Sequence, residues 1–190
     1  MKKNKTFFIL LAVFVVLLVG AWLLYHNLGD RFDPASLAAQ DTTAPDATEG
    51  SVPMAPDFTV TDIDGNSIDL YDFLGKPIIV NFWASWCGPC KSEMPAIEEA
   101  YNANGDDIHF LIINMTDGSR ETVNSASDYI AQSGYTFPVY YDTMLDAATT
   151  YGVYSIPATY FIGADGSAIA YYTGAMSRDI LQQGIDLLLP

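Results

Sequence analysis

The stretch PIIVNFWASWCGPC, residues 77–90, constrains the fold of this chain more than any other. Its first eight residues are almost all apolar, which is typical of a strand buried on both faces of a parallel sheet. Gly88 and Pro89 then follow Cys87, and proline is well suited to the first position of a helix. A buried strand that runs directly into a helix predicts an α/β fold with helices packed on a central sheet.

Residues 54–190 contain further apolar runs, turn residues and helix caps that predict the other elements. The expected strands are 58–61 and 67–70, which flank Asp64-Gly65-Asn66, followed by 77–84, 108–115, 139–141, 158–163 and 167–173. The expected helices are 88–102, 121–132, 146–151 and 177–189, the last with Ser177 as its N-cap. This order predicts an α/β sandwich whose central strands are parallel and whose late hairpin is antiparallel.

The N-terminus of the chain is a candidate membrane anchor. An uncharged apolar run, residues 7–24, follows Lys2, Lys3 and Lys5. As a helix it would be about 27 Å long, close to the roughly 30 Å hydrocarbon core of a bilayer. Because the run exceeds the roughly 7–15 residues of a signal-peptide core, an uncleaved signal-anchor within residues 1–25 is favoured over a cleaved peptide. The lysines place the N-terminus in the cytoplasm and the remainder of the chain outside the cell membrane.

Two segments of different composition follow this run. Residues 26–53 are rich in Asp, Ala, Thr, Ser, Pro and Gly, which predicts a flexible extracytoplasmic tether. Residues 54–190 are rich in aromatic and branched aliphatic residues and form one domain that is large enough to bury its own core. All 23 acidic residues follow the apolar run, but only five of the eight basic residues do, so the external part carries about −18. This charge argues against a nucleic-acid partner, because phosphate contacts need a basic surface.

Cys87 and Cys90 are the only cysteines, and they could form a structural staple, half of a metal site or a redox-active dithiol. A zinc site needs four ligands, and the only histidines, His26 and His109, lie in the tether and near the start of a strand. Covalent haem attachment would need a histidine where Lys91 stands. A disulfide that closes so short a loop stabilises a fold little. The sequence therefore predicts a redox dithiol, with no metal and no cofactor.

The two cysteines are expected to have different roles. Cys87 lies in the exposed turn before the helix, so its thiol faces the positive end of the helix dipole, which lowers a thiol pKa. Cys90 lies one turn further on, in a stripe continued by Met94, Ile97 and Tyr101, and is expected to be shielded and to have a higher pKa. Cys87 would then exchange with the substrate, and Cys90 would resolve the mixed disulfide.

Three residues near the cysteines are candidates for supporting roles. Glu93 lies on the same side of the helix as Cys90. It is either an ordinary solvated carboxylate or, if partly buried, a proton acceptor with a raised pKa. Asn81 in the apolar strand is expected to be a polar core residue satisfied by the backbone. Pro95 removes one hydrogen bond from the helix and predicts a kink there.

The segment WASWCGPC, residues 83–90, resembles the thioredoxin active site. The pattern C-x-x-C-x-x-E-x-P, residues 87–95, resembles the TlpA/ResA-type membrane-anchored thiol–disulfide oxidoreductases. The segments APDF at 55–58 and GVYSIPATYFIGADG at 152–166 fit the same family, so the resemblance covers nearly all of 54–190. It implies a thioredoxin-like fold: a central mixed β-sheet flanked by helices, with an N-terminal β-hairpin, preceded by one transmembrane helix.

The resemblance also implies a role for each site residue. By this likeness the catalytic residues are the nucleophile Cys87, the resolving Cys90, the carboxylate of Glu93 and a cis-proline, Pro157. The substrate groove would be formed by Trp86, Gly88, Pro89 and Ile156. Asn81, where thioredoxin itself has a buried Asp, and Pro95 would support the site. One departure is Tyr160, which stands where family members often have a second proline.

The function expected from these features is reduction of disulfides in exported proteins. The resemblance implies apocytochrome c, or peroxide and methionine-sulfoxide repair enzymes, as partners, hence a part in cytochrome c biogenesis or antioxidant activity. A CcdA-like membrane protein would supply the electrons. The alternatives are a disulfide donor, a non-catalytic thioredoxin-fold module that binds or escorts a partner, and a peroxide reductase. A peroxide reductase would need an assisting arginine, and no basic residue flanks Cys87 in sequence before Lys91. Copper delivery would need a suitably placed histidine, and the domain offers only His109.

Overall fold

The computed structural model describes residues 18–19 and 52–189 of the chain. The chain divides into two compact units, Met1–Ser36 and Leu37–Pro190, and only Leu18 and Val19, both helical, are described in the first. Within the described residues, no helix has the length and apolar character needed to span a bilayer. The rest of the predicted anchor, and the predicted tether up to residue 51, lie outside the described residues.

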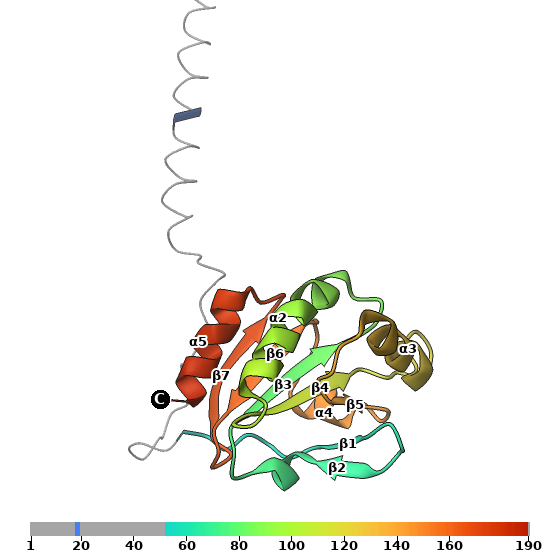
Figure 1. The fold of residues 1–190 in the computed structure, drawn as a ribbon, viewed down its shortest axis with the longest axis horizontal. Coiled ribbons are helices and arrows are strands. Elements are labelled where there is room, and N and C mark those ends of the chain that lie inside the picture. The colour runs from blue at the N-terminus through green and yellow to red at the C-terminus, as the bar shows by residue number, and fades with distance from the viewer. Residues whose placement is uncertain (1–17, 20–51, 190) are drawn as a thin grey trace, which may run out of the picture. The chain divides into compact units, whose positions relative to one another are not determined.

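A seven-stranded mixed sheet forms the centre of residues 52–189 (Figure 1). Its strands are β1 (Thr59–Thr61), β2 (Ser67–Asp69), β3 (Ile78–Trp83), β4 (His109–Asn114), β5 (Val139–Tyr141), β6 (Ala158–Ile162) and β7 (Ala168–Thr173). They are ordered β2-β1-β5-β4-β3-β6-β7. The central strands β3, β4 and β5 are parallel, while the β1–β2 and β6–β7 hairpins are antiparallel and flank them. This is the mixed sheet with an N-terminal hairpin that was expected.

Helices pack on both faces of the sheet. They are the 3₁₀ helix η1 (Leu70–Phe73) and the α-helices α2 (Gly88–Asn104), α3 (Val123–Ser133), α4 (Asp146–Thr150) and α5 (Arg178–Leu188). One core joins residues of α2, α3 and α5 to Ile79 and Trp83 of β3. A second core joins η1 and α4 to Ile78, Val80 and Phe82. Because alternate residues of β3 enter different cores, the whole strand is buried, as its apolar run predicted.

The expected elements are found with ends shifted by at most two residues, and only η1 was not expected. The Oγ of Ser177 accepts a hydrogen bond of 3.3 Å from the amide of Ile180, so the predicted cap of α5 is confirmed. Pro95 lies inside α2, as the sequence required. The parallel pairing of β3 with β4 places the carboxyl ends of both strands at one edge of the sheet, and α2 begins at that edge.

Candidate active site

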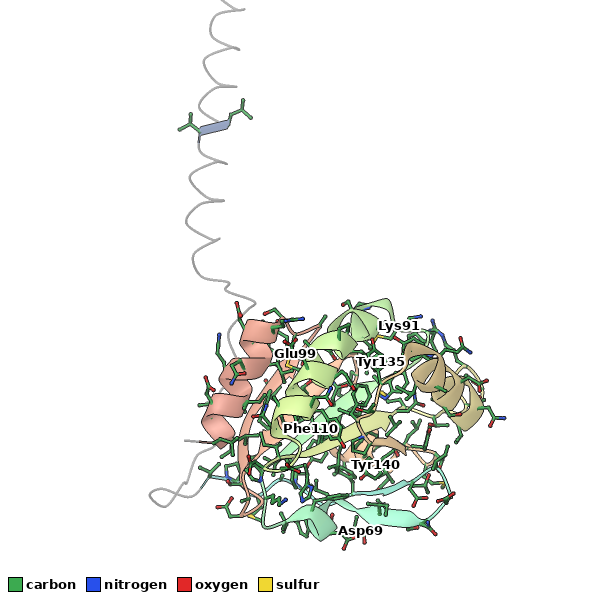
Figure 2. All side chains as sticks on the ribbon, in the orientation of Figure 1. Asp69, Lys91, Glu99, Phe110, Tyr135 and Tyr140 are labelled. Atoms are coloured by element: carbon green, nitrogen blue, oxygen red, sulfur yellow. A yellow bond between two sulfur atoms is a disulfide. The ribbon has the colours of Figure 1, made fainter. Side chains whose placement is uncertain are left out.

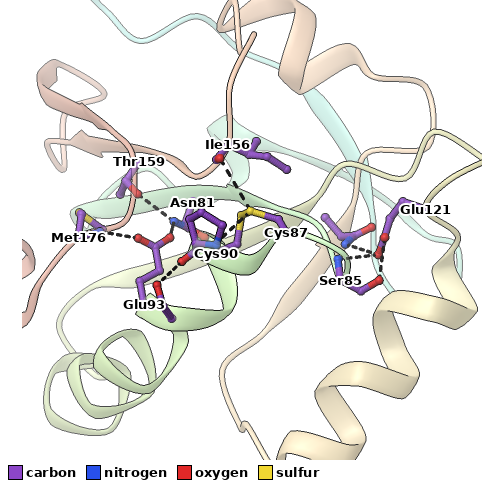
Figure 3. The surroundings of a disulfide bond; sticks show 12 residues. Asn81, Ser85, Cys87, Cys90, Glu93, Glu121, Ile156, Thr159 and Met176 are labelled. Carbon is purple, nitrogen blue, oxygen red and sulfur yellow. Dashed lines mark hydrogen bonds between the residues drawn. A yellow bond between two sulfur atoms is a disulfide. The ribbon is translucent and has the colours of Figure 1, made fainter.

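Cys87 and Cys90 are joined by a disulfide at the start of α2, with their Cα atoms 5.3 Å apart (Figure 3). Cys87 is the N-cap of α2, and its Sγ accepts a hydrogen bond of 3.1 Å from the amide of Cys90. Its side chain thus occupies the position where unpaired amides and the helix dipole favour negative charge. The residues that were assigned to the nucleophile and the resolving thiol therefore lie in chemically different places.

Both cysteines are buried in this oxidised state. Cys90 is fully buried, on the stripe that Met94 and Ile97 continue, as expected. The expectation that Cys87 lies in an exposed turn is wrong, because only 4% of the residue is accessible. The segment before β6 covers it: Sγ of Cys87 lies 3.8 Å from the carbonyl oxygen of Ile156. Trp86, Gly88 and Pro89, by contrast, are exposed around it.

The covering segment contains the Ile156–Pro157 peptide bond, which is cis, as the resemblance implied. Antiparallel pairing of β6 with β3 aligns Ala158 with Phe82 and so brings Pro157 to the edge of the sheet where the disulfide lies. A groove of about 220 Å³ opens between Trp86 and this segment. It is lined by Trp86, Met115, Asp117, Leu145, Val153, Tyr154, Ser155 and Ile156.

Glu93 is not a solvated helix carboxylate. Only 2% of it is exposed, although it lies on α2 just beyond Cys90. Its Oε1 accepts a hydrogen bond of 2.8 Å from Asn81 Nδ2, and its Oε2 accepts one of 2.8 Å from the amide of Met176 (Figure 3). Burial raises the pKa of Glu93 to about 7, and the bonds from Met176 and Asn81 oppose that rise in part. A carboxyl group with this pKa can exchange a proton near neutral pH.

Asn81 is fully buried in β3, but the expectation that the backbone satisfies its side chain is wrong. Its Nδ2 donates to Glu93 and, at 2.9 Å, to Oγ1 of Thr159. These side-chain partners follow from the register of the sheet, which pairs Asn81 with Thr159 of β6, and from the packing of α2, which carries Glu93, on the same strand. Its Oδ1 has no hydrogen-bond partner among the described residues.

A second buried carboxylate near the disulfide, Glu121, was missed by the sequence analysis. It is fully buried just before α3 and accepts hydrogen bonds from the amide and Oγ of Ser85, at 3.1 and 2.8 Å, and from Asn114 Nδ2, at 3.0 Å. Figure 3 shows Glu93 and Glu121 to either side of the disulfide. The sequence offered a signal for a polar cluster here. Ser85 follows β3 and Asn114 ends β4, and the carboxyl ends of these adjacent parallel strands lie at one edge of the sheet.

A basic residue, Arg120, contacts the active-site turn from a distant part of the sequence. In the sequence near Cys87 itself, the first basic residue is Lys91. The guanidinium carbon of Arg120 lies 3.5 Å from the centroid of a Trp86 ring. Lys91 lies near the start of α2 (Figure 2), and its Nζ is 5.3 Å from the ring centroid of Tyr129. His109 begins β4 and packs its ring against Phe73, with centroids 5.2 Å apart. Across residues 18–19 and 52–189, no group of three or more metal-binding side chains occurs.

The chain is similar to known thiol–disulfide oxidoreductases in sequence. Residues 53–171 match the model of the AhpC/TSA family. The thiol-disulfide oxidoreductase ResA of Bacillus subtilis is 28% identical, over 100% of this chain and 97% of the relative. The protein of the same name from Bacillus anthracis is 33% identical, over 72% of this chain and 77% of the relative.

Solved structures show the same thioredoxin-like fold. A putative thiol:disulfide interchange protein DsbE from Chlorobium tepidum superposes with a TM-score of 0.65 and 25% identity, covering 75% of this chain and all of that one. StoA from Bacillus subtilis gives a TM-score of 0.60 and 26% identity, covering 69% of this chain and 97% of that one. The central mixed sheet with helices on both faces is therefore a thioredoxin-like fold.

Proposed function

The chain belongs to the AhpC/TSA family and is a thiol-disulfide oxidoreductase of the ResA type, and we propose that it reduces disulfides of exported proteins through Cys87 and Cys90. The observation that carries the proposal is the pairing of unlike cysteines. Cys87 caps the N-terminus of α2 and lies against the carbonyl of Ile156, and Cys90 is fully buried three residues before Glu93 on the same helix.

The first step is attack on the substrate by the reduced protein. The thiolate of Cys87 forms a bond to one sulfur of the substrate disulfide, the substrate S–S bond breaks, and one substrate thiolate leaves. The amide of Cys90 and the positive end of α2 stabilise the attacking thiolate, because both favour negative charge at Cys87 Sγ. The product is a mixed disulfide between Cys87 and the substrate.

The second step releases the substrate. The thiol of Cys90 loses its proton and attacks Cys87 Sγ, forming the Cys87–Cys90 disulfide and expelling the second substrate thiolate. Two electrons have then passed from the dithiol to the substrate. We infer that Glu93 takes the proton of Cys90, because it lies three residues further along α2 and its pKa of about 7 makes it a base that is partly ionised at neutral pH. The product of this step is the oxidised protein, with the Cys87–Cys90 disulfide formed.

The location and partners of the protein form part of the proposal. The apolar run after the N-terminal lysines anchors the chain in the cell membrane, N-terminus inside and catalytic domain outside. A CcdA-like membrane protein returns two electrons to the Cys87–Cys90 disulfide. The substrates are apocytochrome c or peroxide and methionine-sulfoxide repair proteins, as the family resemblance implies.

Insulin reduction by the full chain tests the activity. With dithiothreitol as electron source, the wild-type chain should accelerate precipitation of the insulin B chain, and Cys87→Ser should not. An inactive wild-type protein that still binds disulfide-containing partners would favour the escort module instead. In the native host, Cys90→Ser should retain its substrates as mixed disulfides on Cys87, and their identity names the partners.

Protease added to intact cells tests the location. The catalytic domain should be removed while a cytoplasmic control protein stays intact. Protection of both proteins would contradict the proposed orientation.

A further inference from the structure

The loop between β4 and α3 is fixed in place at both of its ends. Near its start, one oxygen of Asp117 accepts hydrogen bonds from the amides of Ser119, Arg120 and Glu121, at 2.8, 2.8 and 2.9 Å. At its end, the buried carboxylate of Glu121 binds the amide and hydroxyl of Ser85 in the active-site turn. This loop therefore has a defined position relative to the cysteines.

Its position places Arg120 on Trp86. Consecutive residues of the loop, Arg120 and Glu121, contact consecutive residues of the active-site turn, Trp86 and Ser85. The guanidinium carbon lies 3.5 Å from the centroid of a Trp86 ring, a distance at which the two planar groups are in contact. Trp86 directly precedes Cys87 and is 41% exposed, and Arg120 is exposed as well, so this contact lies at the solvent-facing surface of the active-site turn.

The charge of Arg120 has no counterion within residues 52–189. The single ion pair found there joins Arg178 to Glu99. The nearby carboxylate of Asp117 is engaged by the loop's own amides, which hold its pKa below the usual range. A guanidinium carries five N–H donors, and stacking on a ring leaves those donors at its edge free to bind an acceptor. The site thus presents a guanidinium without a counterion among residues 52–189, in a domain with far more acidic than basic residues.

The groove beside Trp86 indicates which part of a substrate would approach Arg120. Trp86, Ile156 and Asp117 line it, and Cys87 lies against Ile156, while Arg120 contacts the Trp86 ring from outside this lining. Because Trp86 directly precedes Cys87 and carries the guanidinium against its ring, we expect residues next to a substrate cysteine at Cys87 to come within reach of Arg120. The planar donors of arginine match a carboxylate in shape and charge, and can bind it through two parallel hydrogen bonds.

We propose that Arg120 is a specificity-determining residue that binds a carboxylate next to the disulfide of the substrate. The inference rests on the proposed function and adds a substrate class to it: disulfides flanked by Asp or Glu. A cation held over Trp86 steers acidic segments to the dithiol and disfavours basic ones.

Two cyclic disulfide peptides that differ only in Asp or Asn beside each cysteine test the proposal. The reduced full chain is mixed with each peptide, quenched with acid and alkylated, and the second-order rate of peptide reduction is measured. The wild-type chain should reduce the Asp peptide about 1.5- to 5-fold faster at low salt, the range expected for one exposed charge pair. Arg120→Gln should bring the ratio to about one, and Arg120→Lys should restore part of it.

Lys76→Gln is the matched control, because it removes an equal charge whose Nζ instead donates to the Asp106 carbonyl, outside the site. The preference should survive in this variant, which excludes an effect of net charge alone. In the wild type the preference should shrink as salt is raised, which tests the charge without any substitution. Equal rates for the two peptides in the wild type, or an unchanged ratio in Arg120→Gln, overturn the role of Arg120. Failure to reduce either peptide overturns the proposed function itself.

Discussion

The side-chain amide of Asn81 donates a hydrogen bond of 2.8 Å to Oε1 of Glu93, and both groups are almost wholly excluded from water. A carboxylate in such a place is expensive to ionise, and the amide is one of two donors that offset this cost. The balance leaves the pKa of Glu93 at about 7, raised from its ordinary value of 4.5. The proton affinity of Glu93 is therefore raised chiefly by its burial, and the amides of Met176 and Asn81 limit that rise.

Replacement of Glu93 by glutamine should slow release of the mixed disulfide. If ionised Glu93 accepts the proton of Cys90, the wild-type rate should rise as pH increases through about 7, where the carboxyl group loses its proton. Glu93→Gln should lack this step and follow only the ionisation of the thiol. The loss should approach the lower end of the roughly 10²–10⁴-fold that general bases contribute. Stopped-flow measurement of substrate release from pH 5 to 9 gives the profile, and a wild-type profile in the variant would exclude the proton transfer.

Replacement of Asn81 by alanine should move that pH dependence upward. The substitution removes a donor that favours ionised Glu93, so its pKa rises further, by about one unit for a hydrogen bond to a charged group. Asn114→Ala is the matched control, because Asn114 is an equally buried amide that donates to Glu121 instead. Both variants lose stability, but only Asn81→Ala should shift the midpoint of substrate release. A shift of equal size in both would mean that general loosening of the fold causes it.

Glu93 should also make the stability of the protein depend on pH. An acid whose pKa is raised on folding binds its proton more tightly in the folded state, so stability falls as pH rises from about 4.5 to about 7. The penalty above pH 7 is about 3 kcal/mol for a rise of this size. The unfolding free energy of oxidised Glu93→Gln, relative to wild type, should therefore increase by about that amount between pH 4.5 and 8. Urea unfolding at several pH values measures it.

Glu98 of the same helix gives a control for that experiment. Its carboxylate is exposed and accepts bonds from Thr136, and its pKa is lowered, not raised. Glu98→Gln should show no gain relative to wild type over the same pH range. A similar gain in both variants would assign the effect to the charge of α2 as a whole.

The two thiols of the reduced protein should react at different rates. Cys87 is expected to be alkylated rapidly by iodoacetamide near neutral pH, because its sulfur lies at the helix N-terminus with a small accessible area. Cys90 should react slowly, since it is fully buried. Mass spectrometry of the alkylated peptides gives both rates. Cys90→Ser should accumulate mixed disulfides and Cys87→Ser should not; equal reactivity of the two thiols would remove the basis for their assigned roles.

Much of the fold followed from local patterns along the chain. The apolar run of β3, Pro89 at the start of α2 and Ser177 before α5 each report on their own neighbours, so no tertiary information was needed. The helix η1 was missed because its four residues, Leu70–Phe73, are too few to show a period.

The parts of the site that were missed depend on the sheet. Asn81 meets Thr159 only because β6 pairs with β3 in one register. Arg120 reaches Trp86 only because β3 and β4 end at the same edge and the loop after β4 turns back on itself. The burial of Cys87 has the same origin, since Ile156 comes from a distant segment. The sequence and its family resemblance named Cys87, Cys90 and neighbours such as Ile156, but they did not give the contacts that the sheet makes between distant segments.

The reduction potential should decide the direction of electron flow. Strong oxidants owe their potential to a reduced form that is stabilised through a low thiol pKa. Gly88 and Pro89 add no charge to the helix dipole at Cys87, and ionised Glu93 would disfavour a second negative charge at Cys90. We therefore expect a potential nearer the roughly −270 mV of thioredoxin than the roughly −120 mV of a strong oxidase. Equilibration of the full chain with glutathione buffers measures it. Glu93→Gln should raise the value, because the variant no longer opposes the thiolate. A wild-type potential above about −195 mV, midway between the two, would make this protein a disulfide donor.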